Sequence, residues 1–163
     1  MPVYLKLGNL KGAATSSQYK DWIEVDSYSW GFSVAVQTTS GASGNRVSSG
    51  KVTPGDLHLT KKQDDSTTQF MIQSLQGKNT ENATLAVTRQ ASDGGEQKYM
   101  EYTLSNVICS SFTTSGTSAS GSQPNENITL NFTSVQINQF LTDAAGNERA
   151  VRGGVDFQQN KSL

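Results

Sequence analysis

Hydrophobic and polar residues alternate with a period of two along most of this chain. The alternation is visible in seven segments: VYLKL, WIEVDSYSWGFSVAV, DLHLTK, ATLAVTR, YMEYTLSNVICSSF, NITLNFTSVQI and GVDF. Successive side chains of a strand point to opposite faces of a sheet, so this period predicts strands with one buried face. Seven such segments predict an all-β fold.

The residues expected to face the core change parity in three of these segments. In one, Ile23 and Val25 occupy odd positions, whereas the later members are even: Tyr28, Trp30, Phe32, Val34 and Val36. The same change occurs between Leu104 and Val107, and again after Phe132. A slip of one residue would turn the core face outward, so the chain must bulge or bend at each point. Three bends favour a closed or sharply coiled sheet over a flat one.

One segment, DDSTTQFMIQSLQGK, has a helical pattern instead. Ser66 precedes Gln69 by three residues, which is the capping-box spacing, and two aspartates stand directly before it. Gly77 occupies the position of a C′ glycine. A narrow stripe would face the core: Phe70, Met71, Ser74 and Leu75. These features predict one helix over about residues 66–76, covering an open edge or end of the barrel.

Two long polar segments separate the predicted strands, at residues 37–56 and 113–127. In the first, Val47 and Val52 are the only branched apolar residues, and four residues are glycine. We expect residues 37–56 to form a long extended loop. A loop of this length inside a compact domain is uncommon, and it usually reflects function, disorder or a wrong element assignment. Neither segment is a domain linker because strands continue on both sides, so we expect one domain over residues 1–163.

Composition argues against several partners. The chain has 163 residues, 13 Lys and Arg against 14 Asp and Glu, and a net charge of −1, with the signs well mixed. No basic patch is visible, so we expect no nucleic-acid partner. No run approaches the roughly 20 apolar residues that span a bilayer, so we expect no membrane insertion. The N-terminal residues lack a signal-peptide pattern, so export would use a route that does not read one.

The sequence offers few groups for catalysis. It contains one histidine, His58, and one cysteine, Cys109. A single cysteine excludes an internal disulfide, and the pair is too small for a zinc site of the usual Cys/His kind. Residues 143–148 lack the alternating acidic ligands of a calcium loop. We therefore expect no enzyme, no cofactor and no metal site.

The faces expected to point outward carry small or hydroxylated, uncharged side chains. They are Ser29, Gly31, Ser33 and Ala35; Thr84, Ala86 and Thr88; and Thr129, Asn131 and Thr133. A solvated sheet face normally carries more Lys and Glu. Either these faces are weakly charged solvent surfaces, or they pack against another subunit or line a wide cavity. Periodicity alone does not choose between these interpretations.

Several segments resemble, in order, the haemolysin-coregulated protein (Hcp) family, the tube subunit of the bacterial type VI secretion system. They are YLKLGNLKG, IEVDSYSWGFS, GKVTPGDLHLTKKQDDSTTQFM and NENITLNFTSVQI, which together span most of residues 3–140. The resemblance points to the EvpC-type branch of the family.

The resemblance implies a two-sheet β-barrel with one flanking helix. It implies a homo-hexameric ring with a wide channel, and rings that stack into a tube inside a contractile sheath, topped by a spike protein. The tube would be expelled from the bacterial cytoplasm without a cleaved signal peptide, to the outside or into a target cell. Effector proteins would travel, protected, in the lumen.

The resemblance also implies roles for particular residues. Ser29, in the YSWG motif, would face the lumen and contact cargo. The long segment from Thr38 to Gly55 would reach onto a neighbouring subunit or ring. Its expected interface residues are Thr38, Ser40, Asn45, Arg46, Val47, Lys51, Val52 and Thr53.

Two other functions remain open at this stage. A carbohydrate-binding or adhesin-type β-sandwich would need an exposed aromatic side chain, for which Trp22 is the candidate. A small hydrolase would need His58 in a pocket with an acid and a nucleophile.

Overall fold

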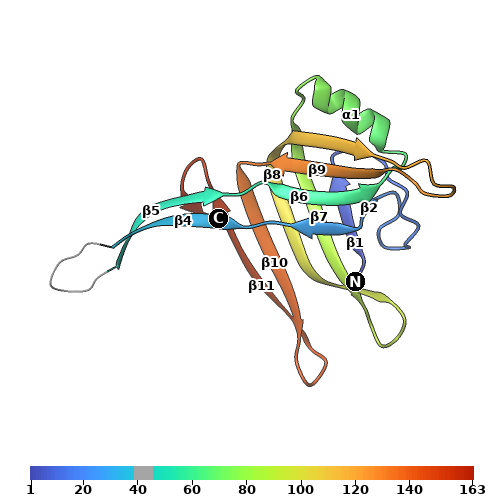
Figure 1. The fold of residues 1–163 in the computed structure, drawn as a ribbon. Helices are drawn as coiled ribbons and strands as arrows, with labels where there is room; N and C mark the ends of the chain where they lie inside the picture. Colours follow the sequence, from blue (N-terminus) through green and yellow to red (C-terminus); the bar gives the residue numbers. More distant parts are fainter. Residues whose placement is uncertain (39–45) are drawn as a thin grey trace.

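The computed structural model describes residues 1–38 and 46–163, and the side chains of residues 1–36 and 52–163. These residues form twelve strands and one helix (Figure 1). The elements are β1 (Val3–Leu7), β2 (Ile23–Val25), β3 (Ser27–Ser29), β4 (Phe32–Thr38), β5 (Arg46–Pro54), β6 (Leu57–Lys62), α1 (Thr67–Leu75), β7 (Thr80–Gln90), β8 (Glu96–Ser115), β9 (Asn125–Asn131), β10 (Ser134–Thr142), β11 (Glu148–Asp156) and β12 (Lys161–Ser162).

The strands form one branched sheet and one separate two-stranded sheet. The main path runs β12-β11-β10-β8-β7-β1-β2, and a branch runs β8-β9-β6-β3. The first part of β8 pairs with β7 and β10, and its second part pairs with β9. This long strand therefore joins two layers around one core. The predicted all-β fold with two layers and one helix is confirmed, but the strands do not close into a barrel.

The three predicted changes of face coincide with breaks or bends in the strands. Asp26 separates β2 from β3, and the segment that contains Phe132 is divided into β9 and β10. Within β8, Asn106 has a left-handed φ of 51°, and the register with β9 shifts between Cys109 and Ser111. Each break lets the next strand keep its apolar residues on the core side.

The core lies between the two layers and is built from the alternating apolar residues. Leu5, Leu85 and Leu130 are at most 1% exposed. Burying a side chain of this size stabilises the fold by about 1.5–3 kcal/mol before entropy is counted. These residues come from three different strands, so the core holds the main sheet and its branch together.

A second cluster of buried side chains covers the outer face of β1 and β7. Residues 8–22 fold over these strands, and the Tyr4 and Tyr19 rings stack with their centroids 4.6 Å apart. Ala86 lies beneath this cover and is fully buried. Thr88 is also fully buried, and its amide and hydroxyl donate to the Pro2 carbonyl at 2.9 and 3.1 Å. The prediction that Ala86 and Thr88 face outward is therefore wrong, because chain segments distant in sequence cover them: residues 8–22 at Ala86 and the N-terminal residue Pro2 at Thr88.

Helix α1 confirms the predicted helix, and Gly77 follows it with a φ of +66°. Its start uses different chemistry from the predicted capping box, because the Ser66 side chain caps no helix amide. Instead Asp64 Oδ1 accepts hydrogen bonds from the Ser66 amide and hydroxyl at 3.0 and 2.5 Å. Phe70 enters the core, with its ring centroid 5.9 Å from that of Phe112. Leu75, expected to face the core, is 85% exposed.

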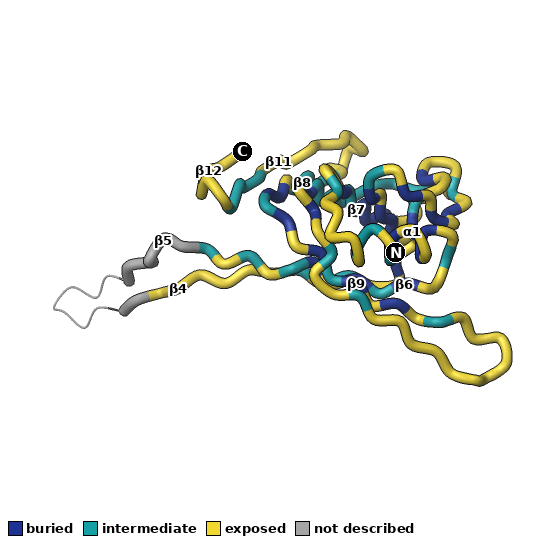
Figure 2. Tube along the Cα trace, turned by 90° about the horizontal axis from the view of Figure 1, so that it is seen from above, coloured by how far each residue is buried: buried dark blue, intermediate teal, exposed yellow. Residues whose placement is uncertain are grey.

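Residues 32–38 and 46–54 form a projecting two-stranded sheet, which we call the arm, made of β4 and β5 (Figures 1 and 2). Its strands pair antiparallel from Phe32↔Pro54 to Thr38↔Arg46, so residues 46–54 are a strand and not part of a loop. The arm continues the β3–β6 hairpin beyond Gly31 and Gly55. It leaves the body there, so its apolar residues lose the opposite layer. Phe32, Val34 and Val36, predicted as core residues, are 65%, 37% and 59% exposed.

Candidate functional site

Ser29 lies on an exposed polar face of the four-stranded branch β3-β6-β9-β8. Strand register places Ser29 opposite His58, His58 opposite Thr129, and Thr129 opposite Ser111. The four side chains therefore form one row across the face. Thr129 Oγ1 lies 3.2 Å from His58 Nδ1, so the two middle side chains of the row bond to each other.

Neighbouring rows on this face continue the same chemistry. Ser27 Oγ and Thr60 Oγ1 are 2.5 Å apart. At the other side of the Ser29 row, the Ser110 hydroxyl and the Asn131 amide donate to the two Asp56 carboxylate oxygens at 2.7 and 2.8 Å. The face is thus covered by short polar side chains, several of which bond to a neighbour, and it offers little apolar area to a bound molecule.

His58 sits in the middle of this face without the partners of a catalytic histidine. It is exposed, and the hydrogen bond of its ring is to the threonine hydroxyl of the neighbouring strand. Among residues 1–38 and 46–163, no three His, Cys, Asp or Glu side chains are grouped so that they could hold a metal ion. The geometry therefore gives no support to the hydrolase interpretation.

The eight residues predicted for a subunit interface fall on the arm or beside it. Val52 and Thr53 lie in β5, opposite Val34 and Ser33, and Val52 is half-buried whereas Thr53 is exposed. Thr38 ends β4 opposite Arg46, and both Val47 and Lys51 lie in β5. Ser40 and Asn45 lie outside the described residues, as do the side chains of Thr38, Arg46, Val47 and Lys51.

A groove of about 400 Å³ opens where the arm meets the β10–β11 hairpin; we call it the apolar groove. Its lining residues are Trp30, Phe32, Val52, Met100, Val135, Ile137, Gln139, Val151, Arg152, Gly153, Gly154, Val155 and Phe157. The indole Nε1 of Trp30 donates to the Gly55 carbonyl at 2.9 Å and so fixes the base of the arm. Sequence reasoning missed this groove because it assigned Phe32 to the core and gave residues after 138 no role.

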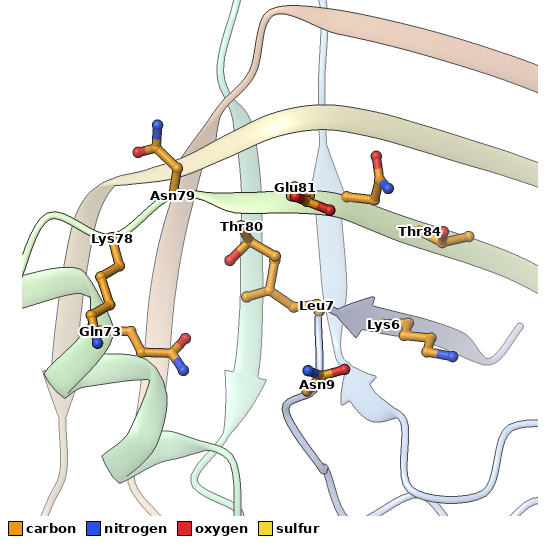
Figure 3. Close-up of a pocket in the computed structure, with 11 residues that line it drawn as sticks. Lys6, Leu7, Asn9, Gln73, Lys78, Asn79, Thr80, Glu81 and Thr84 are labelled. Atoms are coloured by element: carbon orange, nitrogen blue, oxygen red, sulfur yellow. The ribbon is translucent and has the colours of Figure 1, made fainter.

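A second cavity, of about 570 Å³, is polar (Figure 3). Its labelled side chains come from β1, the end of α1 and the start of β7, and they include Lys6, Asn9, Gln73, Lys78 and Glu81. The lining offers amides and charges of both signs but no histidine or cysteine. No hydrogen bond or ion pair among the described residues joins two of the lining side chains into a catalytic pair.

A buried ion network fixes α1 to the body. Lys61 is 1% exposed, and its Nζ lies 2.8 Å from Glu126 Oε2 and 2.8 Å from Asp64 Oδ1. The ammonium also donates to the Thr67 hydroxyl at 3.3 Å. Lys61 lies opposite Glu126 in the β6–β9 register, so the network joins two strands to the first turn of the helix.

A buried tyrosine anchors the cover formed by residues 8–22. The Tyr4 hydroxyl donates to Glu96 Oε1 at 2.8 Å, and the Ser16 hydroxyl donates to Glu96 Oε2 at 2.9 Å. Burial, and then the hydrogen bond to the Glu96 carboxylate, raise the pKa of Tyr4 to about 12. The tyrosine therefore stays protonated at neutral pH and acts as a structural donor.

Comparison with known proteins gives consistent matches. The model of the family described as "Type VI secretion system effector, Hcp" matches residues 4–139. Protein hcp1 of Pseudomonas aeruginosa is 32% identical over 160 residues, which cover 97% of this chain and 96% of that protein. The matches specify the family without specifying the EvpC-type branch.

Solved structures agree with the fold. The structure of a type six secretion system protein superposes with a TM-score of 0.86 at 24% identity, covering 99% of both chains. Hcp1 from Salmonella typhimurium gives a TM-score of 0.77 at 22% identity, covering 99% of this chain and 98% of that one. At these identities the superpositions establish the shared fold.

Proposed function

The chain belongs to the Hcp family and is a structural subunit of the type VI secretion tube; from this premise we propose that six copies close into a homo-hexameric ring and that rings stack. Hcp proteins are ring-forming, secreted components and not enzymes. We propose further that residues 1–163 act as one domain that waits in the bacterial cytoplasm and is then expelled, outside or into a target cell.

In this proposal the exposed face around Ser29 lines the lumen. The observation that supports it is the chemistry of the face, where short polar side chains bond to their neighbours across four strands. Such a face holds passing effectors weakly, which suits a conduit that must release them. Its strands also leave β3 with one free edge in the described residues, where the next subunit can approach.

The arm is the proposed contact with a neighbouring subunit or ring. Its residues at this contact would be Thr38, Ser40, Asn45, Arg46, Val47, Lys51, Val52 and Thr53. Support comes from the projection of the arm (Figure 2) and from its apolar side chains Phe32 and Val36, which are 65% and 59% exposed. Contacts that are weak singly add up when they are repeated around a ring and along a tube.

Other partners follow from the role of a tube. They are the spike protein, the contractile sheath and effector proteins, with no cofactor, no nucleic acid and no membrane insertion. In the described part of the chain, no helix has the length and apolarity needed to cross a bilayer. The carbohydrate-binding alternative is not favoured by the family, and its candidate aromatic, Trp22, packs edge-on against Tyr19 beneath the Lys6 ammonium, 5.9 Å from the ring.

Deletion of residues 41–50 tests the proposal. We expect the body to remain folded, because its core residues lie outside this segment, while ring or stack formation weakens. Light scattering and negative-stain images report assembly, and circular dichroism reports folding. A wild-type protein that stays monomeric at micromolar concentration would contradict the ring. A deletion variant that unfolds would show instead that the arm belongs to the core.

A further inference from the structure

The exposed face around Ser29 carries few side chains that can hold a charge. In the described residues, its charged or titratable side chains all lie on or beside β6: Asp56, His58 and Lys62. They alternate with residues whose side chains enter the core, so they point to the same side of the sheet as Ser29. The residues that share a row with His58 and Lys62 on the other strands are serine, threonine or asparagine. The charge of the face is therefore set by one strand.

Asp56 and Lys62 hold the permanent charges of the face, and each has neutral partners. The Asp56 carboxylate accepts two hydrogen bonds from uncharged side chains, and the Lys62 ammonium donates to the side-chain oxygen of Asn125. Neither residue forms an ion pair with another described residue. Their opposite charges cancel, so the face is close to neutral as long as His58 is uncharged.

His58 lies between these two charges along β6 and beside Ser29. Its side chain is exposed, and its position opposite Ser29 in the strand register places the two Cβ atoms about 5 Å apart. A cargo group that contacts Ser29 therefore also meets the imidazole. Histidine is the side-chain type whose charge changes between about pH 5 and pH 8, and the sequence contains no other histidine. The charge of this face therefore changes at one position in that range.

Protonation of the imidazole leaves the row of side chains intact. Thr129 Oγ1 is 3.2 Å from His58 Nδ1. A hydroxyl group both donates and accepts, so this hydrogen bond forms with the neutral imidazole as well as with the imidazolium. The added charge should therefore change what the face binds without changing the fold.

We propose that His58 makes the retention of effectors in the lumen depend on pH. Above about pH 7 the face is neutral and holds an effector weakly; below about pH 6 the imidazolium and Lys62 together attract acidic segments of the effector. In the proposed ring, on which this inference rests, every copy would add one imidazole to the wall of the channel. Each exposed charge pair is weak, and its repetition around the ring strengthens the attraction while leaving it reversible.

Binding of a fluorescent peptide of ten aspartates to purified wild-type rings tests the proposal. Aspartate side chains stay ionised at both of the pH values compared. We expect the affinity, measured by fluorescence anisotropy, to be at least about threefold higher at about pH 5.5 than at about pH 7.5. Because the attraction is between exposed charges, the difference should shrink at about 0.5 M salt. A peptide of ten serines, which has no charged side chain, should show no difference.

Three substitutions separate His58 from the other charges of the chain. His58→Gln keeps a polar side chain that cannot titrate, so the affinity should be the same at both pH values. His58→Lys is charged at both pH values, so the affinity should be high at both. Lys20→Gln removes an exposed cation from the cover of residues 8–22, outside this face, and should leave the pH difference unchanged. All three positions replaced are exposed, so light scattering should show normal rings.

The outcomes separate this inference from the proposed function. Equal wild-type affinities at the two pH values, or a pH difference that persists in His58→Gln, would overturn the role of His58. The lumen assignment would still hold if Ser29→Gln lowered the recovery of an effector. Loss of the pH difference in Lys20→Gln would place the bound peptide outside the lumen and would also overturn the role of His58. Wild-type protein that forms no rings would refute the proposed assembly and this inference with it.

Discussion

The body and the arm are built from the same alternating pattern but place it in opposite environments. In β7 of the body, Leu85 and Val87 are fully buried. In β4 of the arm, Val34 and Val36 also alternate with small polar residues, yet they are 37% and 59% exposed. The opposite layer covers the first pair, whereas the second pair lies beyond that layer and keeps much of its surface exposed.

The contrast between body and arm shows that the apolar face of a strand and the origin of its cover are two separate properties. Alternation states which face of a strand is apolar. It does not state whether the cover of that face comes from the same chain. Burial within the body therefore stabilises the fold, whereas the arm exposes apolar area that is available for association. Substitutions in the body should change the free energy of unfolding, and substitutions in the arm should change assembly.

The largest effect on stability is expected at the buried ion network. Lys61→Met removes the cation from between Glu126 and Asp64 and leaves a carboxylate buried without a partner, which costs about 3–5 kcal/mol. Urea denaturation measures this loss. Lys62→Met, at the exposed neighbouring residue, should cost less than about 1 kcal/mol. Similar losses for the two variants would mean that the network does not hold the body together.

A matched pair of truncations tests the contrast between body and arm directly. Leu85→Ala should cost about 2–5 kcal/mol through lost burial and a residual cavity. Val36→Ala, in the arm, should change unfolding by less than about 0.5 kcal/mol and should weaken assembly. A large loss of monomer stability from Val36→Ala would show that the arm belongs to the folding unit.

A smaller effect is expected where residues 8–22 cover the sheet. Tyr4→Phe removes the hydrogen bond to Glu96 and should cost about 1–3 kcal/mol at pH 7, since the bond is to a charged group. The folded pKa of Tyr4, about 12, lies above the usual 10.0, so its contribution is complete below pH 10 and is lost as the pH rises toward 12. The stability difference between the wild type and Tyr4→Phe should therefore shrink above pH 10. A difference that is constant from pH 7 to pH 11 would contradict the assigned role.

The smallest effect on stability is expected at Ser29, where the body passes into the arm. Ser29→Gln adds a longer polar side chain on an exposed face, so unfolding should change by less than about 0.5 kcal/mol and rings should still form. We expect the amount of a lumen-bound effector recovered with the protein to fall. Ser17→Gln, away from this face, is the control. Unchanged effector recovery would refute the lumen assignment.

Sequence predicted the body well where the signals were local. The helix was found from polar residues at its start and Gly77 at its end, and Leu5, Leu85 and Leu130 were found from period two. Lys61 was missed, although it continues the inward series of Leu57 and Leu59, and its partner Glu126 precedes Ile128 in the same way. Opposite charges at inward positions of two strands are a readable signal for a buried pair.

The remaining errors came from contacts that are distant in sequence. β5 carries few apolar residues, so its pairing with β4 depends on the backbone and leaves little trace in the side-chain pattern. Ala86 looked outward because the cover of residues 8–22 lies far from it in the chain, and Thr88 looked outward because its partner, Pro2, does too. The apolar groove unites residues from both ends of the sequence, and no local window contains it.

The 20-residue strand β8 has a mechanical consequence. Because one continuous backbone runs through both layers, sliding one layer past the other would require β8 itself to stretch or to break its hydrogen bonds with β7, β9 and β10 together. A push on one layer is therefore carried to the other along a covalent chain. The subunit should resist sudden axial thrust as a single stiff body, and deformation under load should be concentrated in the arm.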